Sequence, residues 1–142
     1  MKVRDVMSRN VIRIGAEEPA EVAARTLTHY NIGALPVCGG DGRLCGVVTD
    51  RDLVTRCMAS GRCAETVKVR DVMTGRVIAA GPDMALEEVA ELMGKEQVRR
   101  LPVVENGKLC GMVSLGDLAN RGESEAKTAK TLALITANLS RK

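Results

Sequence analysis

An internal duplication is the feature that most restricts how this chain of 142 residues can fold. The segment Lys2–Met7 recurs letter for letter as Lys68–Met73, 66 positions later, and the same offset aligns Leu35–Val37 with Leu101–Val103. A repeat of this kind indicates one structural unit used twice. The sequence therefore divides into a first repeat with its N-terminal linker (1–62), a second repeat (63–122) and a tail (123–142) that is expected to be helical.

Each repeat has the element pattern β-α-β-β-α. Short apolar segments (11–14 and 77–78) predict a first strand, and apolar residues at helical spacing then predict an amphipathic helix. The buried stripes are expected at Ala20, Ala23, Ala24 and Leu27 in the first repeat, and at Leu86, Val89, Ala90 and Met93 in the second. A hairpin follows (35–38 with 44–48; 101–104 with 109–113), and Asn106-Gly107 is a strong two-residue turn signal. We expect an α/β (α+β) fold whose small repeats pack on each other with pseudo-twofold symmetry.

Composition narrows the function classes. Hydrophobic residues make up 45% and charged residues 27% of the chain, which is typical of a folded domain. No apolar run approaches the roughly 20 residues of a membrane helix, and the N-terminus lacks a signal-peptide pattern, so we expect a cytoplasmic protein with no membrane partner. A single histidine excludes a multi-histidine metal site within one chain. The net charge of +3 and the single aromatic residue, Tyr30, argue against nucleic acid as a partner, even through Arg99, Arg100 and the tail.

Each hairpin ends in a hydroxyl residue that is followed three positions later by an aspartate: Thr49 with Asp52, and Ser114 with Asp117. This spacing is typical of a helix cap, in which the hydroxyl accepts a hydrogen bond from an early helical N–H group. The same geometry suits a nucleotide, because a helix start favours phosphate and a carboxylate can accept both hydroxyls of a ribose. The two interpretations are compatible, so both stay open.

These segments resemble the CBS domain, and the whole chain is similar to a stand-alone bacterial pair of such domains (a Bateman module). The resemblance covers nearly all of residues 1–122. It is carried by Ile32–Val37 and Gly46–Leu53 in the first repeat, and by Val98–Val103 and Gly111–Leu118 in the second. The resemblance implies tandem CBS repeats with a regulatory function, without catalysis and without a required cofactor.

The resemblance also implies a ligand: AMP, ADP, ATP or S-adenosylmethionine, bound in clefts between the repeats. In the family pattern, Asp52 and Asp117 would bind ribose, and Thr49 and Ser114 would lie near phosphate. Adenine would lie against the early strand and the segment before Leu-Pro-Val, which here comprise Val11, Ile12, Ile32, Gly33, Ala34, Val77, Ile78 and Val98. The family's usual assembly is a face-to-face homodimer, and such a sensor would regulate a partner protein that the sequence does not identify.

The two copies differ near the motif. Arg51 follows Thr49 by two positions and is a candidate phosphate ligand, whereas the second copy has Gly116 there. Arg99 and Arg100 stand where the first copy has Gly33 and Ala34. Arginine binds phosphate bidentately, which favours a phosphate role for Arg100; a surface salt bridge is the alternative. We therefore expect the two clefts to bind unequally.

The main alternative function is a ligand-free protein-interaction or dimerisation module, in which Thr49 and Ser114 are only caps. An enzyme is disfavoured, because the sequence shows no paired carboxylates, nucleophile–base set or metal cluster.

Five cysteines without an export signal predict free thiols. In the first hairpin we expect Cys45 opposite Val37, which would leave Cys38 on the other face and preclude a Cys38–Cys45 bridge. Cys57 and Cys63 are candidates for redox chemistry. In the tail, a helix over 124–139 with Leu132, Ile135 and Leu139 on one stripe would dock on the module or on a second copy, with fraying as the alternative.

Overall fold

The computed structural model describes residues 1–121 and 125–140, and the chain divides into two compact units. Unit 1 comprises residues 1–11 and 78–142, and unit 2 comprises residues 12–77. These units differ from the repeat ranges taken from the sequence. Each copy of the Lys-Val-Arg-Asp-Val-Met segment lies in the unit that the other repeat builds, an exchange that two identical copies cannot reveal in a sequence.

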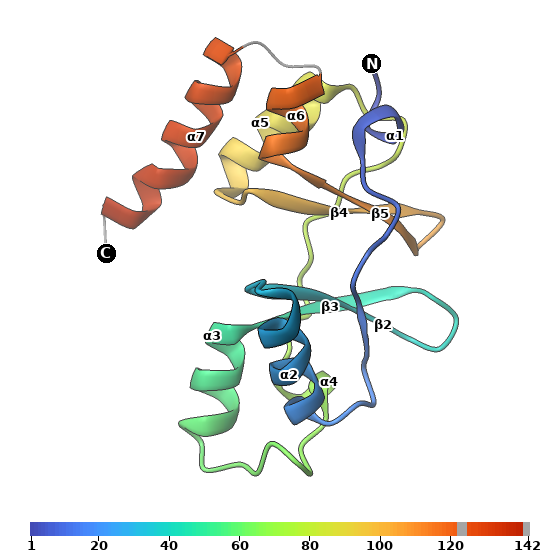
Figure 1. Cartoon of the computed structure of the whole chain (residues 1–142), viewed down its shortest axis with the longest axis vertical. Coiled ribbons are helices and arrows are strands. Elements are labelled where there is room, and N and C mark those ends of the chain that lie inside the picture. Colours follow the sequence, from blue (N-terminus) through green and yellow to red (C-terminus); the bar gives the residue numbers. More distant parts are fainter. Residues whose placement is uncertain (122–124, 141–142) are drawn as a thin grey trace. The chain divides into compact units, whose positions relative to one another are not determined.

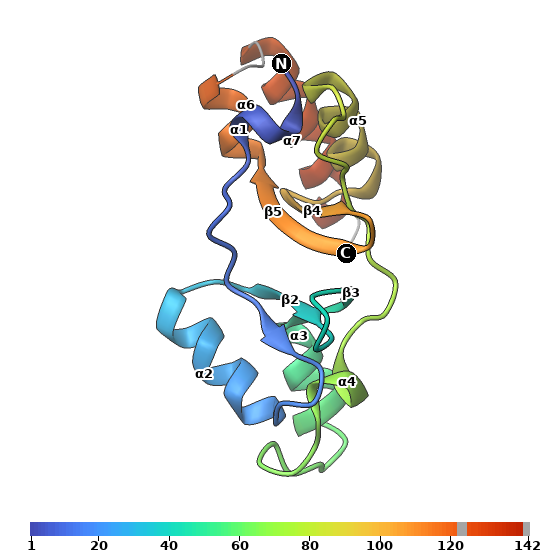
Figure 2. The ribbon, with the colours of Figure 1, turned by 90° about the vertical axis from the view of Figure 1, so that its right-hand side faces the viewer.

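Unit 2 places its helices on one face of a three-stranded sheet (Figures 1 and 2). Strand β2 lies in the middle, parallel to β1 and antiparallel to β3. In chain order the elements are β1 (Ile14–Gly15), α2 (Ala20–Tyr30), β2 (Ala34–Cys38), β3 (Leu44–Thr49), α3 (Asp50–Asp52), the π-helix η1 (Leu53–Met58) and α4 (Val69–Val72).

Unit 1 repeats this arrangement around an antiparallel hairpin. Its elements are α1 (Val3–Val6), α5 (Leu86–Glu96), β4 (Arg100–Glu105), β5 (Lys108–Ser114), α6 (Leu115–Arg121) and α7 (Glu125–Ser140). The predicted two-residue turn is confirmed: Asn106 and Gly107 both have positive φ, at 55° and 80°.

The predicted first strands at 11–14 and 77–78 are wrong in extent. Strand β1 covers only Ile14–Gly15, and the matching segment of unit 1 forms a single parallel bridge between Ala80 and Val103. The apolar, β-branched residues earlier in each segment favour extended backbone. Extended backbone becomes a strand only where a neighbouring chain segment can pair with it.

The two helical stripes are nearly as predicted. In α5, Leu86, Val89, Ala90 and Met93 are all buried. In α2, Ala20, Ala23 and Leu27 are buried, but Ala24 is exposed, which corrects that prediction. Ala90, at the position matching Ala24, is only 7% exposed. The difference follows from α7, which packs on α5 and has no counterpart on α2 among the described residues.

Helix α7 docks on α5 and α6 within unit 1 (Figure 1). Thr131 and Ile135 are buried, and a Cβ added at Gly94 of α5 would lie 2.9 Å from Leu134 Cδ1. The predicted stripe is therefore partly wrong, because Leu132 is 38% exposed. The side chain of Leu139 lies outside the described residues, as do positions 122–124 and 141–142.

In both units the copy of the duplicated segment makes equivalent contacts with the rest of the unit. In unit 1, Arg4 donates to Asp83 (2.9 Å), and Ser8 forms an antiparallel bridge with Met112. In unit 2, Arg70 donates to Glu17 (2.9 Å), and Thr74 forms the matching bridge with Val47. The valines that begin α1 and α4, Val3 and Val69, are fully buried.

These bridges require glycine on the facing strand. A Cβ at Gly46 would lie 2.6 Å from the carbonyl oxygen of Thr74, and a Cβ at Gly111 would lie 3.0 Å from that of Ser8. The distance at Gly46 leaves no room for a Cβ, and the distance at Gly111 leaves room only if the backbone of Ser8 shifts slightly, which accounts for glycine at both positions.

Candidate functional site

The hydroxyl and the aspartate of each copy form a reciprocal cap at the strand–helix junction. In unit 2, Asp52 N donates to Thr49 Oγ1 (3.0 Å) and Thr49 N donates to Asp52 Oδ2 (3.1 Å). In unit 1, Asp117 N donates to Ser114 Oγ (3.1 Å) and Ser114 N donates to Asp117 Oδ2 (2.8 Å). The predicted capping geometry is confirmed in both units. A carboxylate held in this way keeps one oxygen available for another donor.

The start of the first hairpin strand lies beside each junction. In unit 2, Ala34 is the register partner of Thr49, and Asp50 N donates to the carbonyl oxygen of Gly33 (3.1 Å).

In unit 1, Arg100 is the register partner of Ser114, and Leu115 N donates to the carbonyl oxygen of Arg99 (2.8 Å). Within each unit the structure therefore brings together the two motifs that the sequence singled out.

The apolar residues predicted to contact adenine are only partly gathered. Ile12 and Ile32 are half-buried against the core of unit 2, and Ile78 and Val98 are half-buried against the core of unit 1. Val11 and Val77 are half-buried at the ends of the two units. The core clusters of the described residues include neither of them.

Asp52 has more partners than its role as a cap requires. The hydroxyl of Thr74 lies 3.3 Å from both carboxylate oxygens, and Arg56 Nε lies 3.7 Å from Oδ1. Arg56 also donates through Nη1 to the carbonyl oxygen of Met73 (2.9 Å). Asp52 itself is only 6% exposed. Asp52 is thus held by neighbouring side chains, which weighs against an open ribose site at this carboxylate.

Asp117 has a simpler environment. It is half-buried, and among the described residues its carboxylate accepts a hydrogen bond only from Ser114 N, through Oδ2. The position matching Arg56 is Arg121, whose side chain lies outside the described residues.

Sequence reasoning did not identify Thr74 and Arg56 as part of the site. Thr74 directly follows the second copy of the repeated segment, and Arg56 lies four residues after Asp52. The sequence does show that equivalent positions carry Ser8 and Thr74. This difference points to the junction only once it is known that each copy of the repeated segment lies in the unit built by the other repeat.

Three arginines near the junctions, Arg51, Arg99 and Arg100, are exposed. The ion pairs of the described residues include none of the three, so the salt bridge considered for Arg100 is not observed there. Their guanidinium groups are available to an anionic ligand.

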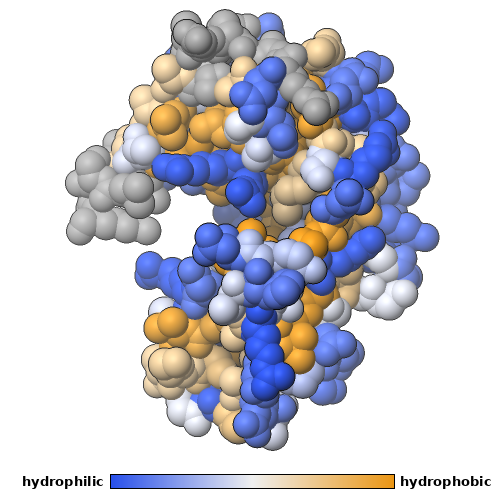
Figure 3. Space-filling view, in the orientation of Figure 1, coloured by the Kyte–Doolittle hydropathy of each residue, from blue (hydrophilic) through white to orange (hydrophobic). Residues whose placement is uncertain are grey.

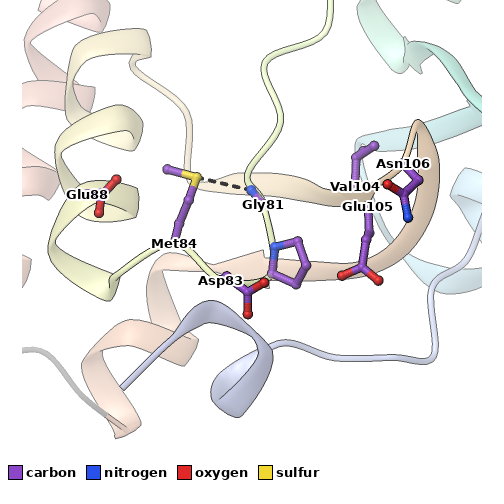
Figure 4. Close-up of a pocket in the computed structure, with 8 residues that line it drawn as sticks. Gly81, Asp83, Met84, Glu88, Val104, Glu105 and Asn106 are labelled. Carbon is purple, nitrogen blue, oxygen red and sulfur yellow. Dashed lines mark hydrogen bonds between the residues drawn. The ribbon is translucent and has the colours of Figure 1, made fainter.

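A surface pocket of about 490 Å³ lies elsewhere in unit 1 (Figure 4). It is lined by Gly81, Pro82, Asp83, Met84, Glu88, Val104, Glu105 and Asn106, none of which was predicted as a site residue. Arg4 Nη2 lies 2.8 Å from Asp83 and 3.5 Å from Glu105. Within the described part of the chain, no group of three or more His, Cys, Asp or Glu side chains could hold a metal ion.

The cysteines are free thiols, as predicted. The predicted register was wrong, because Val37 pairs with Gly46 and Cys38 with Leu44, which leaves Cys45 at a bulge. The second hairpin has its irregularity at the matching place. Burial raises the pKa of the Cys38 and Cys110 thiols, which favours their protonated, less reactive form. Cys57 is buried and Cys63 is exposed.

No described helix combines the length and the apolar character needed to cross a bilayer.

Comparison with known proteins agrees with this architecture. The family model described as "CBS domain" matches residues 3–59 and 69–123. The CBS domain-containing protein YhcV of Bacillus subtilis (strain 168) is 37% identical over 134 residues, which are 94% of each chain. Two similar solved structures contain ligands. CBSX2 in complex with AMP has a TM-score of 0.73 and 28% identity, with 84% of this chain and 93% of that chain covered.

The other is the CBS domain pair of protein MJ0100 in complex with 5′-methylthioadenosine and S-adenosyl-L-methionine. Its TM-score is 0.69 and its identity 28%, and the alignment covers 84% of this chain and 94% of that chain. The family match covers both repeats and most of the chain. The similar structures share the mixed helix-and-strand fold described above. The protein belongs to the CBS domain family, as a chain with two CBS repeats.

Proposed function

We propose that this protein is a non-catalytic regulatory module that binds adenosine-containing ligands (AMP, ADP, ATP or S-adenosylmethionine) at its strand–helix junctions. The observation that carries the proposal is the doubled junction itself. In both units a hydroxyl and a carboxylate cap the helix that follows the hairpin, beside the segment that precedes Leu-Pro-Val. The ligand would act as a regulatory signal in the cytoplasm, and the module would need no other cofactor.

The chemistry of the junction supports this choice of ligand. A carboxylate accepts hydrogen bonds from the two hydroxyls of a ribose, and a guanidinium binds phosphate through two parallel N–H groups. Carboxylates occur in both units, and the guanidinium groups of Arg51, Arg99 and Arg100 are exposed. The similar structures of CBSX2 and MJ0100 contain AMP and two sulfur-containing adenosine compounds.

A protein-interaction or dimerisation module is the second candidate, favoured by an apolar surface on η1. Val54 and Met58 are four residues apart and are 53% and 73% exposed. Figure 3 shows apolar surface over the helix that runs from α3 into η1. A homodimer that buries this surface is compatible with ligand binding and also with a module that binds no ligand.

A thermal-shift titration with AMP, ATP and S-adenosylmethionine tests the proposal, with GMP as a control for the base. Binding to the folded state alone stabilises it by about 2.7 kcal/mol at a ligand concentration of 100 Kd. We expect at least one adenosine ligand to raise the Tm and GMP to raise it less.

The proposal fails if no adenosine ligand binds below millimolar concentration in equilibrium dialysis. It also fails if Asp52→Ala combined with Asp117→Ala leaves the ligand-dependent increase in Tm unchanged. Each variant is compared with its own ligand-free Tm, so that a loss of capping is not mistaken for a loss of binding.

A further inference from the structure

We infer that the two junctions are unequal: the adenosine ligand binds at Asp117 in unit 1, while Thr74 and Arg56 keep Asp52 closed in unit 2. This inference rests on the proposed function and specifies which junction carries it. It combines two independent differences between the units, one in the partners of the aspartates and one in the charges beside them.

The first difference is that Asp52 has no unoccupied carboxylate oxygen. Oδ2 accepts from Thr49 N, the Thr74 hydroxyl lies 3.3 Å from both oxygens, and Arg56 Nε lies 3.7 Å from Oδ1. The side chain is 9% exposed. A ribose that binds Asp52 would have to compete with the Thr74 hydroxyl and reach a nearly buried group.

Unit 1 has the same backbone, but its described residues lack the contact that Thr74 makes in unit 2. Ser8, at the position matching Thr74, exchanges backbone hydrogen bonds with Met112 at 2.8 and 2.9 Å, as Thr74 does with Val47. Ser8 is exposed, and the hydrogen bonds of the described residues include none from its hydroxyl to Asp117. Threonine is restricted at χ1 by its extra methyl group, whereas serine is not. Asp117 Oδ1 therefore stays available in the described part of unit 1.

The second difference is charge. Arg100 is the register partner of Ser114, so their side chains share one face of the hairpin, and Arg99 precedes it. Unit 2 has the uncharged Gly33 and Ala34 at these positions. The carboxylate of Asp50 lies 3.7 Å from where a Gly33 Cβ would stand, and Leu115 replaces Asp50 in unit 1. A phosphate is thus attracted by two arginines in unit 1. In unit 2 it meets Arg51 and the carboxylate of Asp50, and the other arginine there, Arg56, lies 3.7 Å from Asp52.

Isothermal titration of the full chain with AMP, and separately with adenosine, tests this assignment. For the wild type we expect one AMP site per chain. Asp117→Asn should weaken AMP binding by at least about tenfold, while Asp52→Asn should change it by less than about threefold. Thr74→Val keeps the shape of the side chain but removes the hydroxyl, and it should add a second, weaker AMP site.

The arginines provide a matched pair. Arg100→Ala should weaken AMP binding more than adenosine binding, because only AMP carries a phosphate, and Arg51→Ala should have the smaller effect. Circular dichroism and the ligand-free Tm identify any variant that does not fold. If Asp52→Asn proves unfolded, Thr74→Val still tests the closure, because it leaves both aspartates and both caps in place.

Each outcome decides between the claims. If AMP binds and Asp52→Asn removes binding while Asp117→Asn does not, or if the wild type binds two AMP molecules with equal affinity, the inference is overturned and the proposed function stands. If Thr74→Val binds AMP at one site only, as the wild type does, the claim that Thr74 closes Asp52 is overturned. If neither AMP nor adenosine binds to the wild type or to Thr74→Val, the inference fails together with this ligand assignment. ATP and S-adenosylmethionine titrations then decide the proposed function.

Discussion

In unit 1 the outer side of α5 is covered by α7, whereas the matching side of α2 in unit 2 faces solvent. Ala90 and Gly94 of α5 are buried, while Ala24 and Thr28, at the same positions of α2, are exposed. The inner sides do not differ in this way, because Leu35 and Leu101, at matching positions of the hairpins, are 0% and 1% exposed. The two units therefore have equivalent interiors and equivalent contacts with the duplicated segments (Lys2–Met7 and Lys68–Met73). They differ in the outer face of the long helix and in the surroundings of the junction aspartates.

The largest expected effect tests the shared interior. Leu35→Ala and Leu101→Ala each remove a fully buried side chain, and each should lower the free energy of unfolding by about 2–5 kcal/mol. Urea unfolding of both variants measures the loss. Similar losses confirm that the two cores are equivalent, and a loss below about 1 kcal/mol in either variant would contradict the burial of that leucine.

The second effect tests the contact between each duplicated segment and the strand that it faces. Gly46→Ala places a methyl group 2.6 Å from a backbone oxygen, and Gly111→Ala places one 3.0 Å from the matching oxygen. Overpacking of this kind costs about 1–3 kcal/mol, and Gly46→Ala should be the more damaging variant. Tm values for both variants, with Gly40→Ala as a control at an open position, check this order. Wild-type stability in Gly46→Ala would show that Thr74 does not lie against this strand.

The third effect concerns the caps. Thr49→Ala and Ser114→Ala each remove an N-cap hydroxyl and should cost about 1 kcal/mol. Thr49→Ala should lie at the upper end, because it also loosens the buried Asp52. Urea unfolding measures both losses, and Thr49→Ser and Ser114→Thr serve as controls that keep a hydroxyl. A cost in neither alanine variant would mean that these hydroxyls do not cap the helices in solution.

The smallest effect concerns the surface ion pairs that the duplicated segment of unit 2 makes with Glu17. A hydrogen bond from Lys68 lowers the pKa of Glu17 from its ordinary value of 4.5, with a further contribution from the charge of Arg70. The stabilisation is therefore complete above about pH 4.5 and is lost as the pH falls through the lower pKa of the folded state. The Tm difference between wild type and Glu17→Gln should be small at pH 7 and should shrink at acidic pH and in high salt. A difference that is independent of pH and salt would contradict the ion pair.

Much of the fold could be predicted because its signals are local. The hairpin turn at Asn106-Gly107, the buried stripe of α5 and the caps at Thr49 and Ser114 each depend on residues a few positions apart. The exchange of the repeated segment could not be predicted, because Lys2–Met7 and Lys68–Met73 are identical and either copy satisfies either unit. The exposure of Ala24 was missed for a related reason: whether a helix face is covered depends on α7, which is distant in the chain.

The site was predicted in outline and missed in detail. The hydroxyl–aspartate spacing correctly predicted a cap, since a cap needs only a span of four residues. It could not show that Thr74, 22 positions beyond Asp52, donates to the same carboxylate. The contact between Thr74 and Asp52 is long-range, and the similarity between the repeats conceals it.

A crystal structure of the protein grown with saturating AMP tests the central claim most directly. The account predicts ribose hydroxyls within hydrogen-bond distance of the Asp117 carboxylate, a phosphate near Arg100, and Asp52 still bonded to Thr74. Nucleotide density at Asp52 with Asp117 unoccupied, or no nucleotide density at either aspartate, would contradict it.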